Sequence, residues 1–214
     1  MKNEKLIIIS PGWGNSTFNL KLIENRFRNE GYDVMIVLND PEGIHASAMR
    51  LAGALQRAHE EYEHISFIGY SMGGLVGRYL IHKFPQYNYI DSYTSIGTPH
   101  DGTLTAQIAY WSNTAHEMKI DSELIRDLNE FEWPPQIPAL AIQADRDLLV
   151  IPGENSKFSF AENITIPHST HLTVIMSKRT FYEINSWISS IFFPNSFFTR
   201  PQKKGTSSHL RQLL

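Results

Sequence analysis

The sequence predicts an α/β protein: a three-layer sandwich in which a mostly parallel six-stranded sheet carries helices on both faces. Two observations predict it. Short apolar and β-branched runs alternate along the chain with segments whose apolar residues recur every three or four positions, which is typical of parallel sheets. The chain has 214 residues, 42% hydrophobic and 19% charged, which is enough for one domain with a substantial core.

Six apolar runs are expected to form the strands. The first, Leu-Ile-Ile-Ile, is too short for a signal segment and is followed at once by Ser-Pro-Gly, so it suits a buried strand. Turn residues or periodic segments separate the other runs. The six strands are expected at residues 6–9, 34–38, 65–68, 92–96, 139–143 and 163–166.

The segments between the strands carry helical periodicity. Gly31 follows the first of them, as glycine does after many helices, and Ser122 precedes a later one as a helix cap. The helices are expected at residues 20–27, 44–58 and 75–80, in the segment that carries Leu124, Ile125 and Leu128, and, as one long amphipathic helix, at about residues 172–191.

These elements predict a single domain over residues 1–195. The longest insertion, residues 101–138, lies between the fourth and fifth strands, and we expect it to form a small cap-like element. Residues 196–214 are basic and poor in core residues, which predicts a flexible tail. A weaker alternative is that this tail attaches to a membrane or a partner.

Composition and charge exclude several classes of function. The net charge of −3 gives no basic footprint, so we expect no nucleic-acid partner, and no apolar run is long enough for stable membrane insertion. Without cysteine there can be no disulfide and no thiol nucleophile. We find no metal-ligand spacing and no phosphate loop, so we expect no cofactor and no metal. We expect the protein to be cytoplasmic.

The most informative motif is Gly-Tyr-Ser-Met-Gly-Gly at residues 69–74. It lies between an apolar run and a helix-like segment, the context of a nucleophile elbow with Ser71 at its apex. A serine held in such a strained turn leaves little room for side chains two positions before and after it, which explains Gly69 and Gly73. A glycine-rich helix N-terminus is the alternative interpretation.

With this motif and four others, the chain resembles a small α/β-hydrolase, in particular the compact bacterial lipases and esterases, over residues 6–191. The resemblance implies the spatial strand order 2-1-3-4-5-6. The matching stretches are residues 9–16 after the first strand, 69–74 at the elbow, 97–102 after the fourth strand, 147–150 after the fifth, and His171 before the last helix.

The resemblance also implies a catalytic triad in the order Ser, Asp, His. His171 and His168 both lie after the last strand, and we favour His171 because small and aliphatic residues that begin a helix follow it. Asp147 and Asp145 compete for the acid. We favour Asp147 because an aliphatic stretch ending in valine follows it, whereas Asp145 could pair with Arg146 or cap the turn.

Two backbone N–H groups hold the reacting oxygen in this family. By position they belong to Trp13, in the loop after the first strand, and to Met72, directly after the serine. Family members usually have His-Gly in that first loop, where this chain has Pro11-Gly12. A plain turn is therefore the alternative for this loop.

The substrate contacts are expected from the insertion and from the loop after the fourth strand. Trp111 is expected to bind substrate, and Met118, Phe131 and Trp133 could also line an apolar group, although such residues more often belong to the core. His100, in Gly-Thr-Pro-His, either contacts substrate or supports the floor of the site.

These observations predict a serine hydrolase that cleaves carboxylic esters. Ser71, Asp147 and His171 would form its triad, and its partner would be a small-molecule ester with an apolar acyl group. Thioester hydrolysis and acyl transfer by the same triad remain alternatives. A binding protein that kept the fold without turnover is a further alternative, to which Pro11 lends some support.

Overall fold

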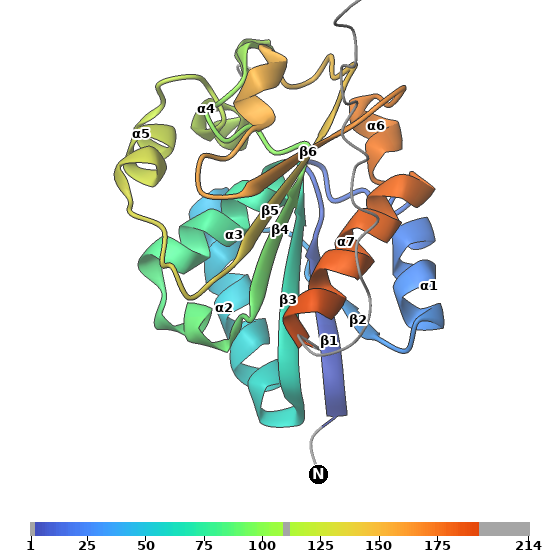
Figure 1. Cartoon of the computed structure of the whole chain (residues 1–214). Coiled ribbons are helices and arrows are strands. Elements are labelled where there is room, and N and C mark those ends of the chain that lie inside the picture. Colours follow the sequence, from blue (N-terminus) through green and yellow to red (C-terminus); the bar gives the residue numbers. More distant parts are fainter. Residues whose placement is uncertain (1–2, 109–111, 193–214) are drawn as a thin grey trace, which may run out of the picture.

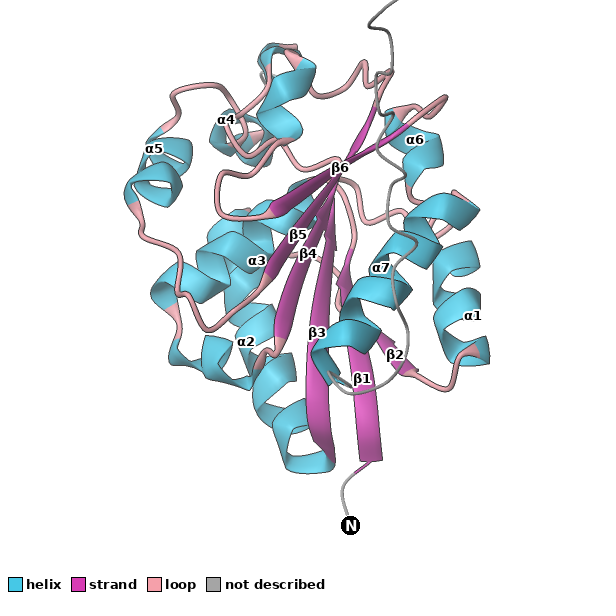
Figure 2. Ribbon diagram, viewed as in Figure 1, coloured by secondary structure: helices cyan, strands magenta, loops and turns pink. Residues whose placement is uncertain are grey.

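The computed structural model describes residues 3–108 and 112–192. Its centre is a six-stranded sheet in the order β2-β1-β3-β4-β5-β6, which is the order that the resemblance implies (Figures 1 and 2). All five strand pairs are parallel. The strands are β1 Asn3–Ser10, β2 Asp33–Ile36, β3 Tyr62–Tyr70, β4 Ser92–Ile96, β5 Ala139–Ala144 and β6 Glu162–Ile166.

Helices cover both faces of this sheet, so the three-layer prediction is confirmed. On one face, α1 (Lys21–Asn29) and α7 (Lys178–Phe192) meet through Phe27 and Phe181, whose ring centroids are 5.0 Å apart. On the other face lie α2 (Ile44–Glu61) and α3 (Met72–Lys83). The shorter helices are α4 (Asn113–Glu117), α5 (Glu123–Glu130), α6 (His171–Val174), η1 (Pro85–Tyr89), η2 (Leu104–Gln107) and η3 (Gly153–Ser156).

Alternate residues of β1 feed the two halves of the core. Ile7 and Ile9 pack with α1 and α7, whereas Leu6 and Ile8 pack with α2 and α3, and all four are at most 1% exposed. This is the period-two geometry of a strand that is covered on both sides. The continuous apolar run of β1 therefore fits its position between two layers of helices.

Two predicted helix ends are confirmed. Gly31 has a φ of +85°, a conformation that costs glycine little, and it directly follows the C-cap of α1. Ser122 caps α5, because its Oγ accepts a hydrogen bond from Ile125 N at 3.2 Å. In both cases a local residue preference was sufficient.

The prediction of one long last helix is wrong. The chain forms α6, which ends at Val174, and then α7, which begins at Lys178. Thr180 Oγ1 donates to the carbonyl of Val174 at 2.6 Å, and Arg26 donates to the carbonyl of Met176 at 2.9 Å. The break is stabilised by contacts that the periodicity of the segment does not contain.

The carboxyl ends of the strands meet at one edge of the sheet, where α/β proteins of this kind bind their ligands (Figure 1). The segment between β4 and β5 forms η2, α4 and α5. The predicted tail at residues 196–214 lies outside the described part of the chain. Within the described ranges, no helix combines the length and the apolar character that crossing a membrane demands.

Candidate active site

Ser71 occupies the strained turn that the sequence predicts. It joins the end of β3 to the start of α3 with φ +54° and ψ −121°, a conformation that non-glycine residues rarely adopt. The turn is held from the next strand, because Ser71 N donates to Ile96 O at 2.8 Å. Thr98 Oγ1 also donates to Ser71 O at 2.9 Å. The surrounding structure thus fixes the serine at the apex.

The flanking glycines are sterically required. A Cβ at Gly69 would overlap with the main chain of Gly74, and a Cβ at Gly73 would overlap with the carbonyl oxygen of Ser10. Both neighbours are backbone atoms, which cannot move aside as a flexible side chain could. The explanation of these two glycines from the sequence is therefore confirmed.

His171 and Asp147 form a buried pair. His171 Nδ1 lies 2.7 Å from Asp147 Oδ2, and the two side chains are 6% and 1% exposed. The other carboxylate oxygen, Oδ1, accepts hydrogen bonds from Leu149 N and Val150 N, each at 2.8 Å. The aspartate is thereby fixed at one oxygen by the main chain and at the other by the imidazole.

The electrostatics of this pair favour a charged aspartate. Burial raises the pKa of the Asp147 carboxyl, but the hydrogen bond and charge of His171 and the two backbone N–H groups outweigh burial, so its pKa lies below the usual value. A carboxylate beside Nδ1 favours the imidazole tautomer that carries its proton there. Nε2 then remains available to accept a proton.

Asp145 and His168, the alternative acid and base, serve a different loop. The Asp145 carboxylate accepts hydrogen bonds from His168 N at 2.8 Å and Ser169 N at 2.9 Å. His168 is exposed, with a φ of +56°, and its Nδ1 lies 3.5 Å from Arg146 Nη2. Neither residue lines the cavity that contains Ser71.

That cavity has a volume of about 250 Å³ and brings Ser71, His171 and Trp13 together. Ala115 and Met118, from the segment between β4 and β5, also line it and are at most 6% exposed. The cavity thus joins a nucleophile and an imidazole to an apolar wall, which is the usual composition of a small-molecule site.

The loop that contains Trp13 lies next to the serine. A Cβ at Gly12 would be 3.2 Å from Ser71 Cβ, so the Gly12–Trp13 peptide passes beside the nucleophile. In the part of the chain that the structure describes, the backbone N–H groups of Trp13 and Met72 have no hydrogen-bond partner. Trp13 lines the cavity, and Met72, which does not line it, directly follows Ser71 in the chain.

His100, for which the sequence leaves open substrate contact or support of the site floor, does not line the cavity. It is 1% exposed, its Nε2 lies 2.9 Å from Ser95 Oγ, and its ring stacks on Phe158 at 4.6 Å. Burial first, and then the charge of Arg78, lower its pKa well below the usual value. Of the two roles considered for His100, these contacts favour structural support.

The predicted apolar contacts separate in the same way. Of the four candidates, Met118 lines the cavity, whereas Trp133 belongs to the core, where its Nε1 donates to Ile137 O at 2.7 Å. Phe131 packs on His82, with ring centroids 4.3 Å apart. Trp111 lies outside the described residues, so its prediction stays open.

Sequence reasoning assigned no role to Gly97 and Tyr70. Gly97 has a φ of +57°, and a Cβ there would lie 3.2 Å from the His171 ring, so this glycine makes room for the imidazole. The Tyr70 hydroxyl donates to His171 O at 2.9 Å, and burial together with the charge of Asp147 raises the pKa of Tyr70 to about 12. Both lie in quoted motifs, but only the tertiary contacts reveal their roles.

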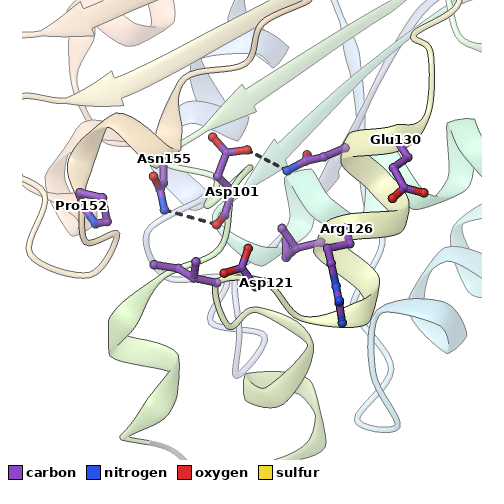
Figure 3. A pocket seen from close by; sticks show the side chains of 9 residues that line it. Asp101, Asp121, Arg126, Glu130, Pro152 and Asn155 are labelled. Atoms are coloured by element: carbon purple, nitrogen blue, oxygen red, sulfur yellow. Dashed lines mark hydrogen bonds between the residues drawn. The ribbon is translucent and has the colours of Figure 1, made fainter.

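A larger hollow, about 460 Å³, lies between α5 and the loops that contain Asp101 and Pro152 (Figure 3). Asn129 and Asn155 both donate hydrogen bonds to Asp101 there, to its carboxylate at 2.9 Å and to its main-chain oxygen at 3.3 Å. None of the residues around this hollow lines the cavity of Ser71. It contains no nucleophile paired with a base, so the cavity of Ser71 is the candidate active site.

Fold and nucleophile elbow together define a serine hydrolase of the α/β-hydrolase class. The family described as "Putative serine esterase (DUF676)" matches residues 2–125, more than half of the chain, and the protein belongs to this family. The matched residues include Ser71 but end before Asp147 and His171. Membership of this family makes the protein an ester hydrolase in the general sense.

Solved structures agree on the fold. The mature form of lipase BlEst2 from Bacillus licheniformis superposes with a TM-score of 0.74 at 15% identity, over 86% of this chain and 91% of that one. Est1E from Butyrivibrio proteoclasticus gives 0.64 at 12% identity, over 90% of each chain. No curated protein sequence matches this chain. At such low identities the structural likeness establishes the fold alone.

Proposed function

We propose that the protein hydrolyses carboxylic esters through an acyl-enzyme on Ser71, with His171 as general base and acid and Asp147 as its orienting partner. One observation carries the proposal: His171, which is paired with the buried Asp147, lines the same cavity as a serine held at positive φ. A nucleophile, a base and a group that orients the base are the parts that covalent acyl transfer needs.

In the first half-reaction Ser71 Oγ bonds to the ester carbonyl carbon while its proton passes to Nε2 of His171. The oxyanion of the tetrahedral intermediate accepts hydrogen bonds from Trp13 N and Met72 N, the two donors without partners in the described residues. Collapse of the intermediate breaks the bond to the alkoxy oxygen. The alcohol leaves with the proton from His171.

In the second half-reaction water attacks the acyl-enzyme. His171 takes a proton from the water, the same two N–H groups hold the second oxyanion, and Ser71 recovers its proton as the acid leaves. Throughout, Asp147 stabilises the imidazolium and keeps the proton on Nδ1.

We further propose a small-molecule ester with an apolar acyl group of short to medium length. A cavity of about 250 Å³, with Met118 and Ala115 in its wall, supports this size and polarity. Thioesters and acyl acceptors other than water would use the same groups, so substrate comparison must distinguish them.

A series of p-nitrophenyl esters of graded chain length tests the proposal. We expect turnover by the wild-type protein with an optimum at short or medium chains. The Ser71→Ala variant should keep the circular dichroism spectrum of the wild type and show no turnover above background. Acyl-thioesters of the same chain lengths should be poorer substrates. A folded wild-type protein without activity on any ester would contradict the proposal and favour a binding protein.

A further inference from the structure

We propose that Asn39 is a positioning residue for the oxyanion site: its buried side chain fixes the loop of residues 10–15 so that Trp13 N–H faces the reacting oxygen. This inference rests on the proposed function. Asn39 is 3% exposed and does not line the cavity, so it acts through the loop and does not touch the substrate.

Both ends of the Asn39 amide bind the loop. Nδ2 donates to Pro11 O at 2.8 Å and lies 3.5 Å from Gly12 O, and Oδ1 accepts a hydrogen bond from Ser10 Oγ at 2.8 Å. An amide is suited to this position because it presents a donor to the carbonyls and an acceptor to the hydroxyl. A carboxylate would offer acceptors on both sides.

The main chain of Asn39 holds the other end of the same loop. Asn39 N donates to Asn15 Oδ1 at 2.7 Å, and Asn15 Nδ2 donates to Asn39 O at 2.8 Å. Asn15 adopts a φ of +56°, which asparagine tolerates better than most residues. Contacts with Asn39 therefore lie on both sides of Trp13 along the chain.

The direction of the proposed donor follows from the Gly12 carbonyl. Asn15 N donates to Gly12 O at 3.2 Å, and Asn39 Nδ2 lies 3.5 Å from the same oxygen. Gly12 C=O and Trp13 N–H belong to one peptide group, and in a planar trans peptide the two point in opposite directions. Holding the carbonyl toward Asn39 and Asn15 therefore turns the N–H the other way.

This arrangement is compatible with the departure of the first loop from the family pattern. Proline at position 11 has no backbone N–H to donate, but its carbonyl is available and Asn39 binds it. The loop thus keeps a fixed conformation with proline in place of the usual histidine. Pro11, the feature that favoured a non-catalytic protein, is compatible with an ordered oxyanion site.

Three variants test the inference, each assayed for kcat, KM and the inhibition constant of an alkyl trifluoromethyl ketone. The ketone forms a tetrahedral adduct with an active-site serine, so its affinity reports the oxyanion donors. We expect Asn39→Ala to lower kcat by about ten- to a hundredfold, below the full loss of one donor because the N–H remains but is misdirected. KM should change little, and the inhibition constant should rise by the same factor as kcat falls.

The other two variants separate hydrogen bonding from shape. Asn39→Asp keeps the size but opposes an acceptor to the Pro11 carbonyl, and we expect it to lose at least as much activity as Asn39→Ala. Asn15→Gly keeps the positive φ accessible and removes only the two side-chain bonds of Asn15, so its loss should be smaller and in the same direction. If Asn39→Ala does not fold, these two variants decide the test.

Asn163→Ala is the matched control. Asn163 holds another loop by three similar bonds, from Phe158 N at 2.9 Å and to Phe158 O and Ala161 O at 2.8 Å each, and it does not line the cavity of Ser71. It should lower the melting temperature but leave kcat and the ketone affinity unchanged.

The results distinguish the two proposals. If the wild-type protein hydrolyses esters and folded Asn39 and Asn15 variants match it in kcat and ketone affinity, the inference is wrong and the proposed function stands. A loss confined to KM, or one equal to that of Asn163→Ala, overturns it as well. A wild-type protein without esterase activity overturns the proposed function and this inference with it.

Discussion

Replacing Asp147 by asparagine should nearly abolish activity while leaving the shape of the site intact. The structure determines how the new amide must lie. Leu149 N and Val150 N both donate to Oδ1, so the amide oxygen of the variant has to take that position. Its NH₂ group then faces His171 Nδ1, which is 2.7 Å from the present Oδ2.

An NH₂ group at that distance selects the wrong imidazole tautomer. It donates to Nδ1, which must then be unprotonated, and the ring proton moves to Nε2, where it opposes deprotonation of Ser71. Such a change in a serine triad lowers kcat by about 10⁴. That factor corresponds to about 5.4 kcal/mol of transition-state stabilisation.

Asp145→Asn is the matched control, because it makes the same chemical change two residues away. Asp145 binds the backbone of His168 and Ser169 and lies outside the cavity. We expect kcat on a p-nitrophenyl ester to fall by less than about threefold, as for exposed positions away from the chemistry. The assignment of the acid is refuted if Asp145→Asn is the more damaging variant, or if Asp147→Asn retains a tenth of the wild-type kcat.

Three further predictions concern the base, the pH dependence and the substrate. His171→Ala should lower kcat on a p-nitrophenyl ester by orders of magnitude and His168→Ala only slightly, and the reverse order would move the base to His168. Because the pKa of Asp147 lies below its ordinary value of 3.8, its charge stabilises the fold above that pH, and this stabilisation is lost as the pH falls through the lowered pKa. In urea unfolding, the stability difference between wild type and Asp147→Asn should therefore shrink as the pH falls below about 4; a difference that does not shrink there contradicts the lowered pKa. Finally, the described residues of the segment 101–138 form only short helices, which is little structure for a large mobile lid, so hydrolysis of tributyrin should show no sharp rise at its solubility limit. A sharp rise would identify a working lid and assign the exposed apolar Leu148 and Leu172 to an interface.

Local features of the sequence were sufficient for most of the fold. The apolar run of β1 indicates a strand that is buried on both sides, as Ile7 and Ile8 show, and Gly31 and Ser122 end or begin helices by their own conformational preferences. The break between α6 and α7 could not be predicted from local features of the sequence. One of the contacts at this break comes from Arg26, which is 150 residues distant in the sequence from its partner Met176.

In the candidate site too, features that depend on a local motif could be predicted, and features that depend on distant contacts could not. The strained turn at Ser71 could be predicted because its cause, two absent side chains, is written in the motif itself. The contributions of Gly97 and Asn39 could not, because each depends on what a distant segment places beside it. In the sequence, Asn39 followed by aspartate is typical of an ordinary turn. Only the structure shows that the loop of residues 10–15 packs against Asn39.

The central claim is that Ser71 is an activated nucleophile, and covalent labelling tests it most directly. The wild-type protein is incubated with a fluorophosphonate probe, digested, and analysed by mass spectrometry, with Ser71→Ala as the control. We predict a single modified peptide, containing Ser71, with labelling that is complete in the wild-type protein and absent from the folded variant. No labelling of the folded wild-type protein, or equal labelling of Ser71→Ala, would contradict the account.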